Sequence, residues 1–396
     1  MSISIHDEIL ELKKEAVELR RDFHQYPELG FKEKRTSKQL ADYLGALGLR
    51  VQTEIAETGV VGFLSGRSPG PTLLIRADMD ALPIEERTEK PYKSKNAGVM
   101  HACGHDGHMA AVMITAKALA RRKEKFSGQI KFVFQPGEEG FAGAREMIRK
   151  GVLIDPKVDS AIGFHLYNSM PLGSVLFRSG PTMASMDSFV IKVIGKGGHA
   201  AMPDEAVDAI LVSAHVVTSL QSLISREVSP LDPLVVHIGT IHGGSAFNIV
   251  SDIVELKGTV RTLNADLQKS MPERMRRVIT NTTAAFKGAA KFDYDFGYPP
   301  LVNDAMMVDL VRNAARDVVK DGGILATQPL MASDDMAFFL REVPGCFFFV
   351  GSANQEKGLN SPHHNSLYDF DEDAMLIAAE ILVKAALSFF DKTELR

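Results

Sequence analysis

The sequence predicts an α/β protein in which a mixed sheet, covered by helices, belongs to a discontinuous domain that carries an inserted ferredoxin-like domain. Helical and extended patterns alternate up to about residue 180 and again after Pro299–Pro300. Between these regions the order changes to strand, helix, strand, strand, helix, strand. We therefore expect one domain formed by residues 1–182 and 299–396, with residues 183–298 inserted into it.

The discontinuous domain is expected to begin with two amphipathic helices, over residues 5–23 and 34–47. Apolar, β-branched runs then predict strands buried under helices on both faces. These runs are VVGFLSG, TLLIRAD, IKFVFQP and AIGFHLY, with a helix MAAVMITAKALARR between the second and the third. Beyond residue 300 we expect a helix AMMVDLVRNAARDVV, a strand PGCFFFVG and a final helix AMLIAAEILVKAALSFF.

The inserted domain is expected to contain four strands and two helices in the β-α-β-β-α-β order. The predicted strands are SFVIKVIGKG, LVVHIGTI, IVELKGTVRTL and AKFDYDFG. The predicted helices are EAVDAILVSAHVVTSLQSLIS and DLQKSMPERMRRVITNTTAAF. Pro181 and the Pro299–Pro300 pair mark the crossings between the two domains, because Pro interrupts regular elements.

Composition and charge argue against several classes of protein. The 396 residues carry a formal net charge of -5 without a basic stripe, so we expect no nucleic-acid partner. The charged N-terminus lacks the pattern of a signal peptide, and no apolar run reaches the roughly 18 residues that a membrane helix needs. Two cysteines, Cys103 and Cys346, lie in unlike surroundings and predict no disulfide. We expect a cytoplasmic protein without membrane contact.

Side chains of the kind that bind metals follow the predicted strands of the discontinuous domain, where ligands of open α/β sheets collect. They are Asp78, Asp80, Glu138, Glu139, His165, His363 and His364, together with Cys103 and His105 of the run HACGHDGH. Thiolate, imidazole and carboxylate together favour Zn, Mn, Co or Ni over Ca or Mg. A transition-metal site is therefore predicted.

Each of these residues also has a purely structural interpretation. A single His after an apolar strand, such as His165, more often belongs to a hydrogen-bonded core, and a Glu-Glu pair is usually solvated surface. The run HACGHDGH is different, because three His, a Cys and an Asp interrupted by Gly rarely serve packing. The occurrence of all of them at successive strand ends favours metal binding.

The chain resembles the M20 metallopeptidase family, and within it the amidohydrolase branch of hippurate hydrolases, N-acyl-amino-acid amidohydrolases and auxin-conjugate hydrolases. The segments that carry the resemblance follow the family's order through essentially the whole chain. They are HQYPELGF, RADMDALPI, MHACGHDGH, FQPGEEG, GFHLYNSMPLG, GKGGHAAMP, AFNIVSD, GTVRTL, LMASDDMAFF and HHNSLYDF. The resemblance implies a hydrolase that uses two divalent transition-metal ions to cleave the amide bond of an N-acyl amino acid, such as hippurate or an N-acetyl-amino acid.

The resemblance also implies roles for individual residues of the discontinuous catalytic domain. The metal ligands of the branch match Cys103, His105, Glu139, His165 and His364. Glu138 matches the general base, which takes a proton from the metal-activated water and delivers it to the leaving amine. Asp80 matches the acidic residue that supports a ligand or the catalytic group, and Asp78 stands where related peptidases usually carry a ligand His.

In the inserted domain the resemblance implies a lid and a dimer contact. His199 matches the lid histidine that stabilises the oxyanion, although GKGG alone is more often a plain turn. Asn248 and Arg261 resemble contacts for the substrate carboxylate or oxyanion. A homodimer formed through this domain is expected. One departure is that Asp204 and Asp208–Ala209 stand where the branch commonly has His and Asp-Pro, so the rim of the substrate pocket is expected to differ.

Three functions stay open at this point. The leading one is hydrolysis of N-acyl amino acids; the second is a dipeptidase or aminopeptidase on the same scaffold, which would bind a free α-amino group. The third is a non-catalytic binding protein, which the joint presence of Glu138, His199 and the five ligand matches disfavours. Apolar residues near the motifs either wall an acyl pocket or belong to ordinary core: Met183, Met186, Met202, Phe247 and Met331.

Overall fold

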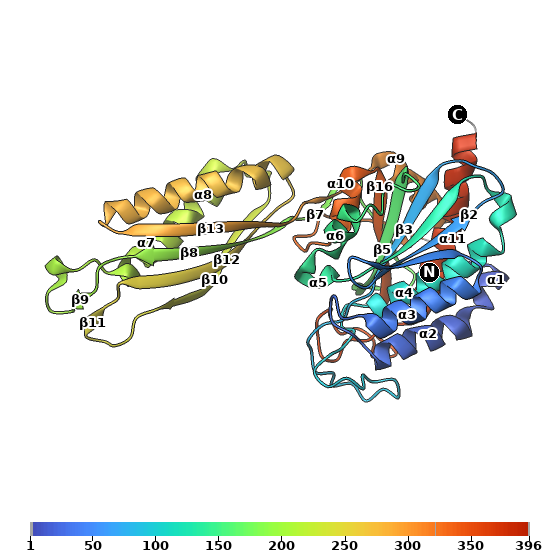
Figure 1. Ribbon diagram of the computed structural model, residues 1–396, viewed down its shortest axis with the longest axis horizontal. Coiled ribbons are helices and arrows are strands. Elements are labelled where there is room, and N and C mark those ends of the chain that lie inside the picture. Colours follow the sequence, from blue (N-terminus) through green and yellow to red (C-terminus); the bar gives the residue numbers. More distant parts are fainter. Residues whose placement is uncertain (1–2, 321, 395–396) are drawn as a thin grey trace. The chain divides into compact units, whose positions relative to one another are not determined.

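The computed structural model describes residues 3–320 and 322–394, which form two compact units. The second unit comprises Pro181–Leu301 and Pro329–Ala337, and the first comprises the other described residues. In Figure 1 the first unit begins in blue and returns in orange and red, because it is built from both ends of the chain.

The first unit contains an eight-stranded mixed sheet among its described residues, as the sequence predicted. In spatial order its strands are β1 (Arg50–Ile55), β2 (Gly59–Ser65), β4 (Gln129–Gln135), β3 (Thr72–Asp78), β5 (Ser160–Pro171), β16 (Gly345–Ala353), β6 (Val175–Phe177) and β15 (Ile324–Ala326). The central strands β4, β3, β5 and β16 run parallel to their neighbours in this group. Strands β1 and β2 are antiparallel to each other, as are β2 and β4. The carboxyl ends of β3, β4 and β5 therefore lie at one edge of the sheet.

Helices cover the sheet of the first unit and share one apolar core with it. Helix α4 packs on β3, while α9 and α11 pack on β16. Along β3 the alternate residues Leu73, Ile75 and Ala77 enter this core, as the period of two in a strand requires. The helices are α1 (Asp7–Leu10), α2 (Lys13–Gln25), α3 (Lys34–Ala46), α4 (His105–Ala120), η1 (Lys123–Lys125), α5 (Glu138–Phe141), α6 (Gly143–Arg149), α9 (Ala305–Arg316), α10 (Met336–Glu342) and α11 (Asp373–Glu394).

Two helices differ from the prediction in ways that matter for the site. The predicted helix 5–23 is interrupted, so that α1 and α2 are separate. The helix predicted from Met109 begins at His105 instead, because Gly104 adopts a φ of 94° that starts the helix one turn earlier. Polar residues of HACGHDGH therefore occupy the first turn of α4.

The second unit has the predicted β-α-β-β-α-β order and an antiparallel four-stranded sheet. The sheet order is β10 (Leu234–Gly243), β12 (Ile253–Thr262), β8 (Met186–Ile194) and β13 (Ala289–Tyr298). Helices α7 (Ala209–Ser222) and α8 (Ala265–Ala285) share an apolar core with this sheet. The remaining elements of the chain are β9 (Gly198–His199), η2 (Pro203–Glu205), η3 (Leu223–Glu227) and β11 (Ile249–Val250), together with β7 (Gly180–Met183) and β14 (Leu301–Asn303), which span the boundaries of the two units.

The segment 329–337 belongs to the second unit, whereas the sequence pattern predicted that all of 299–396 lies in the discontinuous domain. The backbone N–H of Ala184 donates to Leu330 O at 3.0 Å and to Ala332 O at 2.9 Å. These backbone bonds hold the segment against β7, and they leave no pattern in the sequence. Among the described residues, no helix has the length and apolar character needed to cross a membrane.

Candidate metal centre

The predicted ligands of the first unit gather where the central strands end. Strand β3 ends at Asp78 and leads to Asp80, while β4 leads through Pro136–Gly137 to Glu138. Strand β5 carries His165, and α4 begins at His105, two residues after Cys103. Parallel strands that end at one edge of a sheet are what bring these distant segments together.

Two groups of three ligand atoms share the thiol of Cys103. Cys103, His105 and His165 form one group whose ligand atoms all lie within 4.8 Å of one another, and Cys103, Glu139 and His364 form the other. The Cys103 Sγ lies 3.4 Å from His165 Nε2, and His364 Nε2 lies 3.4 Å from Glu139 Oε1. Each group could hold a cation.

The hydrogen bonds of the imidazoles leave their ligand nitrogens available. His105 Nδ1 lies 2.8 Å from Asp80 O, and His165 Nδ1 lies 2.7 Å from Leu166 O. Because a carbonyl oxygen only accepts, each Nδ1 carries a proton, so Nε2 is the nitrogen that could bind a metal. Within the described residues, His105 Nε2 and Glu139 Oε1 are buried without a hydrogen-bond partner. Unpaired ligand atoms of this kind fit a site that a metal completes.

The charges at the centre also favour a cation. Burial, followed by the nearby carboxylate of Glu139, raises the pKa of the Cys103 thiol well above its ordinary value. The nearby carboxylate of Glu139 raises the pKa of His364. The thiol therefore needs a positive charge beside it to become a thiolate, and coordination to a metal provides that charge.

Asp78 lies beside the proposed ligand nitrogen of His105. Its Oδ1 accepts from His108 Nδ1 at 2.6 Å, and its Oδ2 accepts from Arg76 Nη1 at 2.8 Å and lies 3.6 Å from His105 Nε2. Burial alone would raise the pKa of Asp78, but Arg76, His105 and His108 hold it well below its ordinary value. Sequence reasoning did not single out His108, whose Nε2 accepts from the backbone N–H of Leu166 at 2.9 Å.

Asp80 organises the loop that carries the two glutamates. Its Oδ1 accepts from Glu138 N and its Oδ2 accepts from Glu139 N, both at 3.0 Å. Its backbone carbonyl is the one that orients His105. Gly137 and Gly140 adopt φ values of 59° and 89°, so the loop turns sharply around the two glutamates. Asp80 thus contacts both the predicted base segment and a predicted ligand, as a supporting residue would.

The two adjacent histidines occupy different environments. The backbone N–H of His364 donates to Ala102 O at 2.8 Å, and its ring reaches Glu139. His363 instead has its Nε2 accepting from Asn168 N at 3.2 Å and its ring stacked on Tyr167. The geometry therefore favours His364 over His363 as a ligand.

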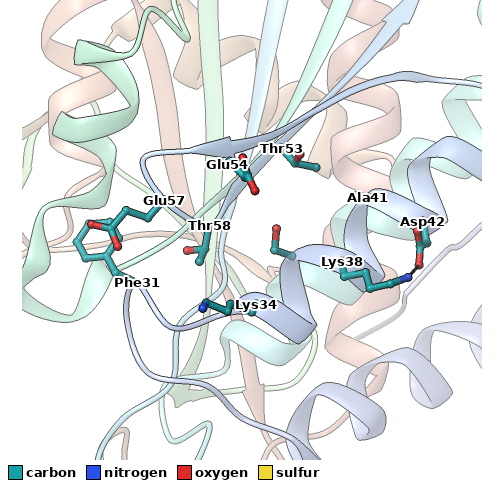
Figure 2. Close-up of a pocket in the computed structure, with 10 residues that line it drawn as sticks. Phe31, Lys34, Lys38, Ala41, Asp42, Thr53, Glu54, Glu57 and Thr58 are labelled. Atoms are coloured by element: carbon teal, nitrogen blue, oxygen red, sulfur yellow. Dashed lines mark hydrogen bonds and ion pairs between the residues drawn. The ribbon is translucent and has the colours of Figure 1, made fainter.

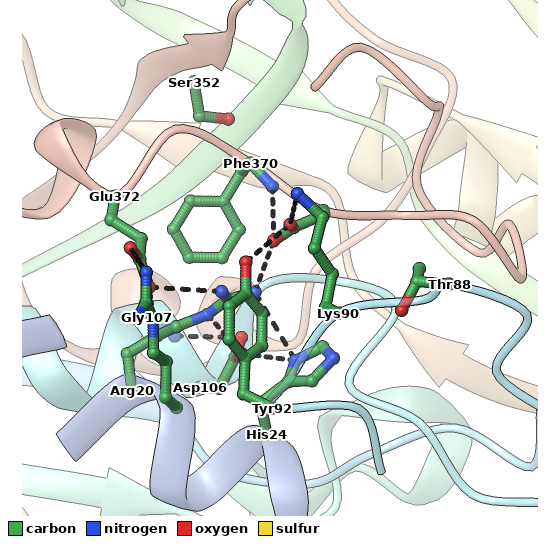
Figure 3. Close-up of polar contacts among 12 residues, drawn as sticks. Arg20, His24, Thr88, Lys90, Tyr92, Asp106, Gly107, Ser352, Phe370 and Glu372 are labelled. Atoms are coloured by element: carbon green, nitrogen blue, oxygen red, sulfur yellow. Dashed lines mark hydrogen bonds and ion pairs between the residues drawn. The ribbon is translucent and has the colours of Figure 1, made fainter. Parts of the chain in front are cut away.

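A buried ion-pair network that the sequence analysis did not identify lies behind the first turn of α4 (Figure 3). Arg20 is 0% exposed; its Nε donates to Asp106 at 2.8 Å and its Nη2 donates to Asp369 at 2.7 Å. His24 Nδ1 lies 2.7 Å from the same Asp106 carboxylate. His24 is the first residue of the motif HQYPELGF. Nothing in the sequence indicates that Arg20, one Arg in a charged helix, is buried.

The network joins two segments that carry candidate ligands. Asp106 follows His105 in α4, and Asp369 lies shortly after His364 in the chain. Although burial opposes ionisation, Arg20 and His24 hold the pKa of Asp106 below its ordinary value. Arg20 and His24 of α2 therefore help to hold both segments in place.

The predicted residues of the second unit lie in two places. His199 in β9 pairs with Ile249 in β11, and Ala200 N donates to Asn248 O at 3.2 Å, so His199 and Asn248 are neighbours on one exposed ribbon. Arg261 in β12 donates to Met331 O and Ser333 Oγ, both at 3.3 Å. Of the apolar residues considered for an acyl pocket, Met183 is buried, whereas Met202 and Phe247 are exposed.

The fold of the chain is similar to that of a metallopeptidase of known structure. A structure described as a dinuclear metal binding peptidase from the M20 family, from Bacillus subtilis, aligns with a TM-score of 0.84 and 31% identity. The alignment covers 96% of this chain and 99% of that chain. Fold and site together therefore define a hydrolase of the metallopeptidase class.

Sequence comparisons identify the family. Residues 74–388 match the peptidase family M20/M25/M40. A protein of Saccharolobus solfataricus named thermostable carboxypeptidase 1 is 37% identical over 393 residues, which are 98% of each chain. The N-acetyl-L-cysteine deacetylase of Bacillus subtilis is 37% identical over 383 residues, covering 97% of this chain and 90% of that protein. The chain belongs to the peptidase family M20/M25/M40, in which it resembles the amidohydrolase branch, and it is a hydrolase of amide bonds.

Proposed function

We propose that the protein hydrolyses the amide bond of N-acyl amino acids, with hippurate-like or N-acetyl-amino-acid substrates. The observation that carries the proposal is the pair of ligand groups that share Cys103. In the proposal, Cys103, His105, Glu139, His165 and His364 hold two divalent transition-metal ions, which are Zn, Mn, Co or Ni. The free thiol of Cys103 fits a reducing compartment such as the cytoplasm.

In this mechanism the protein side chains manage the proton and the geometry. The metal ions, when bound, lower the pKa of a water molecule and polarise the scissile carbonyl. Glu138 takes the proton from that water and passes it to the nitrogen of the leaving amino acid. Asp80 keeps Glu138 and Glu139 in place through their backbone N–H groups.

The second unit supplies the proposed substrate contacts. His199 and Asn248 are neighbours on the β9–β11 ribbon, and we assign them to the oxyanion. Arg261 has the fork geometry that suits the carboxylate of the substrate. We further propose that this unit acts as a lid and forms a homodimer contact.

A second candidate function is peptide hydrolysis. A relative named thermostable carboxypeptidase 1 matches the whole chain as well as the deacetylase does, so the reaction class alone does not separate the two. Both substrates end in an amino acid with a free carboxylate, and they differ in whether the other side is a simple acyl group or a peptide. Binding of a free α-amino group would need a further acidic residue close to the metals.

The test is amino-acid release from N-benzoyl, N-acetyl and longer N-acyl amino acids and from free dipeptides and tripeptides. The enzyme is stripped with a chelator and reloaded separately with Mn, Zn, Co or Ni. We expect metal-dependent cleavage of the acylated compounds, which Glu138→Gln reduces by about 10²–10⁴-fold in kcat. Glu356→Gln, at an exposed position of the same unit, serves as the control and should match the wild type.

Each result has a defined meaning. Cleavage of peptides without cleavage of acyl amino acids would move the function to the peptidase. Binding of metal without turnover of any amide would contradict both candidates.

A further inference from the structure

A buried carboxylate that has no role in the mechanism above holds the loop in front of Glu138. Glu33 is 0% exposed, and its Oε1 accepts from the backbone N–H of Gly137 at 3.0 Å. Its Oε2 accepts from the hydroxyl of Thr58 at 2.6 Å. We call these three residues, Glu33, Thr58 and Gly137, the Glu33 clamp.

The clamp completes a set of bonds to three consecutive N–H groups. Glu33 accepts from Gly137, and Asp80 accepts from the next two residues, Glu138 and Glu139. Two buried carboxylates thus fix the backbone on which the proposed base and a proposed ligand are mounted. Because all three N–H groups are paired with buried side-chain oxygens, this loop has little freedom to move.

The segment that carries Glu33 packs closely against the same loop. An added Cβ at Gly30 would lie 2.7 Å from the Phe141 ring and 3.1 Å from the Gly137 Cα. The segment also holds the loop of Asp80, since Ala81 N donates to Glu28 O at 2.8 Å. One short stretch before α3 therefore contacts both loops that carry the proposed catalytic carboxylates.

Thr58 follows a turn in which several residues other than Gly have positive φ values. Glu54, Ala56 and Glu57, none of them Gly, have φ values of 59°, 53° and 71°. Such conformations cost free energy and persist only where surrounding contacts maintain them. Figure 2 shows Thr58 and Phe31 on the wall of a surface pocket of about 580 Å³ that this turn helps to form. The clamp thus reaches from the surface turn to the catalytic loop.

We propose that Glu33 is a positioning residue: oriented by Thr58, it fixes the Gly137 N–H and so the direction in which Glu138 faces the attacking water. Glu33 touches neither the substrate nor the metals in this scheme. The inference rests on the proposed function, because it assumes that Glu138 is the base.

The chemistry of the clamp predicts which substitution preserves it. Both partners can donate to Glu33, so an amide at this position can still accept from Gly137 N with its oxygen while its NH₂ donates to Thr58 Oγ1. Glu33→Gln should therefore keep the geometry. Glu33→Ala removes both bonds and leaves a backbone N–H unpaired in a buried place.

The kinetic test compares Glu33→Ala, Glu33→Gln and Thr58→Val in the metal-loaded enzyme. We expect Glu33→Ala to lower kcat by about 10- to 100-fold with unchanged KM and metal content, as a displaced catalytic group does. Thr58→Val should fall between Glu33→Ala and the wild type. Glu33→Gln should stay within about threefold of the wild type. Glu57→Ala, which removes an exposed carboxylate from the neighbouring turn, is the control and should have no effect.

Three outcomes would overturn the inference: full kcat in Glu33→Ala, a loss confined to KM or metal content, or a Glu33→Gln enzyme as slow as Glu33→Ala. The second measurement is amide hydrogen exchange of the peptide that contains Gly137, which needs no substrate. Faster exchange in Glu33→Ala, restored in Glu33→Gln, supports the clamp even if no N-acyl amino acid is cleaved and the proposed function fails. Unchanged protection in Glu33→Ala would contradict the clamp itself.

Discussion

Cys103 occupies a position in which one side chain belongs to two groups of ligand atoms. His105 and His165 form one group with its thiol, and Glu139 and His364 form the other. Thiolate, imidazole and carboxylate donors suit transition-metal ions. Two groups of three such donors would accommodate two ions.

The contribution of Glu33 to the stability of the fold should depend on pH. Burial raises its pKa from 4.5 to about 7, so between these values the folded protein binds a proton that the unfolded chain releases. Its contribution to stability is therefore fully present below pH 4.5 and is lost as the pH rises through 7. The loss amounts to about 3 kcal/mol.

Replacing Glu33 by Gln should remove this dependence. Relative to the wild type, the free energy of unfolding of Glu33→Gln should rise by about 3 kcal/mol between pH 4.5 and pH 8. Urea unfolding of both proteins at the two pH values measures the difference, in which the other titrating groups cancel. Parallel pH profiles for the two proteins would show that Glu33 titrates normally in the folded state.

At the residue scale the sequence predicted which side chains could bind a metal, but not which buried side chains hold them in place. The candidate ligands could be predicted because strand ends and motif order are visible in the sequence. The structure brings them together in two groups that share a thiol: Cys103, His105, Glu139, His165 and His364. Arg20 and Glu33 were not identified as parts of the site, and His108 was recognised only as a member of the run HACGHDGH. Their importance comes from burial next to the site, and neither burial nor long-range hydrogen bonding leaves a local pattern.

At the scale of elements, helix α4 brings most of the site's features together. Its first turn carries His105, which is a proposed metal ligand, and Asp106, which belongs to the buried ion-pair network. The same turn carries His108, which hydrogen-bonds to Asp78. Periodicity predicted the apolar part of this helix but not its polar first turn, because that turn interrupts the apolar pattern. The left-handed Gly104 that starts the turn is recognisable only from its backbone angle.

The network beneath α4 should be strongly stabilising as a unit. Arg20→Met would remove the guanidinium that pairs with the buried carboxylates of Asp106 and Asp369, which should lower the free energy of unfolding by about 3–5 kcal/mol. The matched control is Arg21→Met, because Arg21 is partly exposed and pairs with Glu372 at 2.7 Å. That variant should lose no more than about 1 kcal/mol. Equal losses in urea unfolding at pH 7 would show that burial of the pair does not matter.

At the scale of the molecule, the two units were foreseeable and the path of the chain between them was only partly so. Element order predicted the β-α-β-β-α-β sheet of the second unit. The segment 329–337 escaped prediction because its attachment uses backbone bonds to Ala184 and the contacts of Arg261. Such contacts depend on where distant segments meet.

The second unit exposes an apolar patch that fits the proposed dimer. Ile210, Leu211, Phe247 and Ile249 line one hollow of about 550 Å³, and Phe247 is 100% exposed. An exposed patch of this kind usually marks an interaction site. Light scattering should give twice the chain mass of 43.3 kDa for the wild type, and the single mass for Phe247→Asp.

Leu231→Asp is the control for this experiment, because Leu231 is 90% exposed on the same unit but does not line the hollow. It should remain dimeric. A wild-type protein that is monomeric and fully active would refute the dimer.

The position of β16 in the sheet also bears on how the chain is made. This strand lies between β5 and β6, yet its residues, Gly345–Ala353, follow the whole second unit in the sequence. During synthesis the edge of β5 therefore waits, unpaired, until the intervening residues have left the ribosome, which takes on the order of 10–30 s. An open strand edge is a template for pairing with other chains. The length of the inserted unit thus sets how long the open edge of β5 in the nascent protein can pair with other chains.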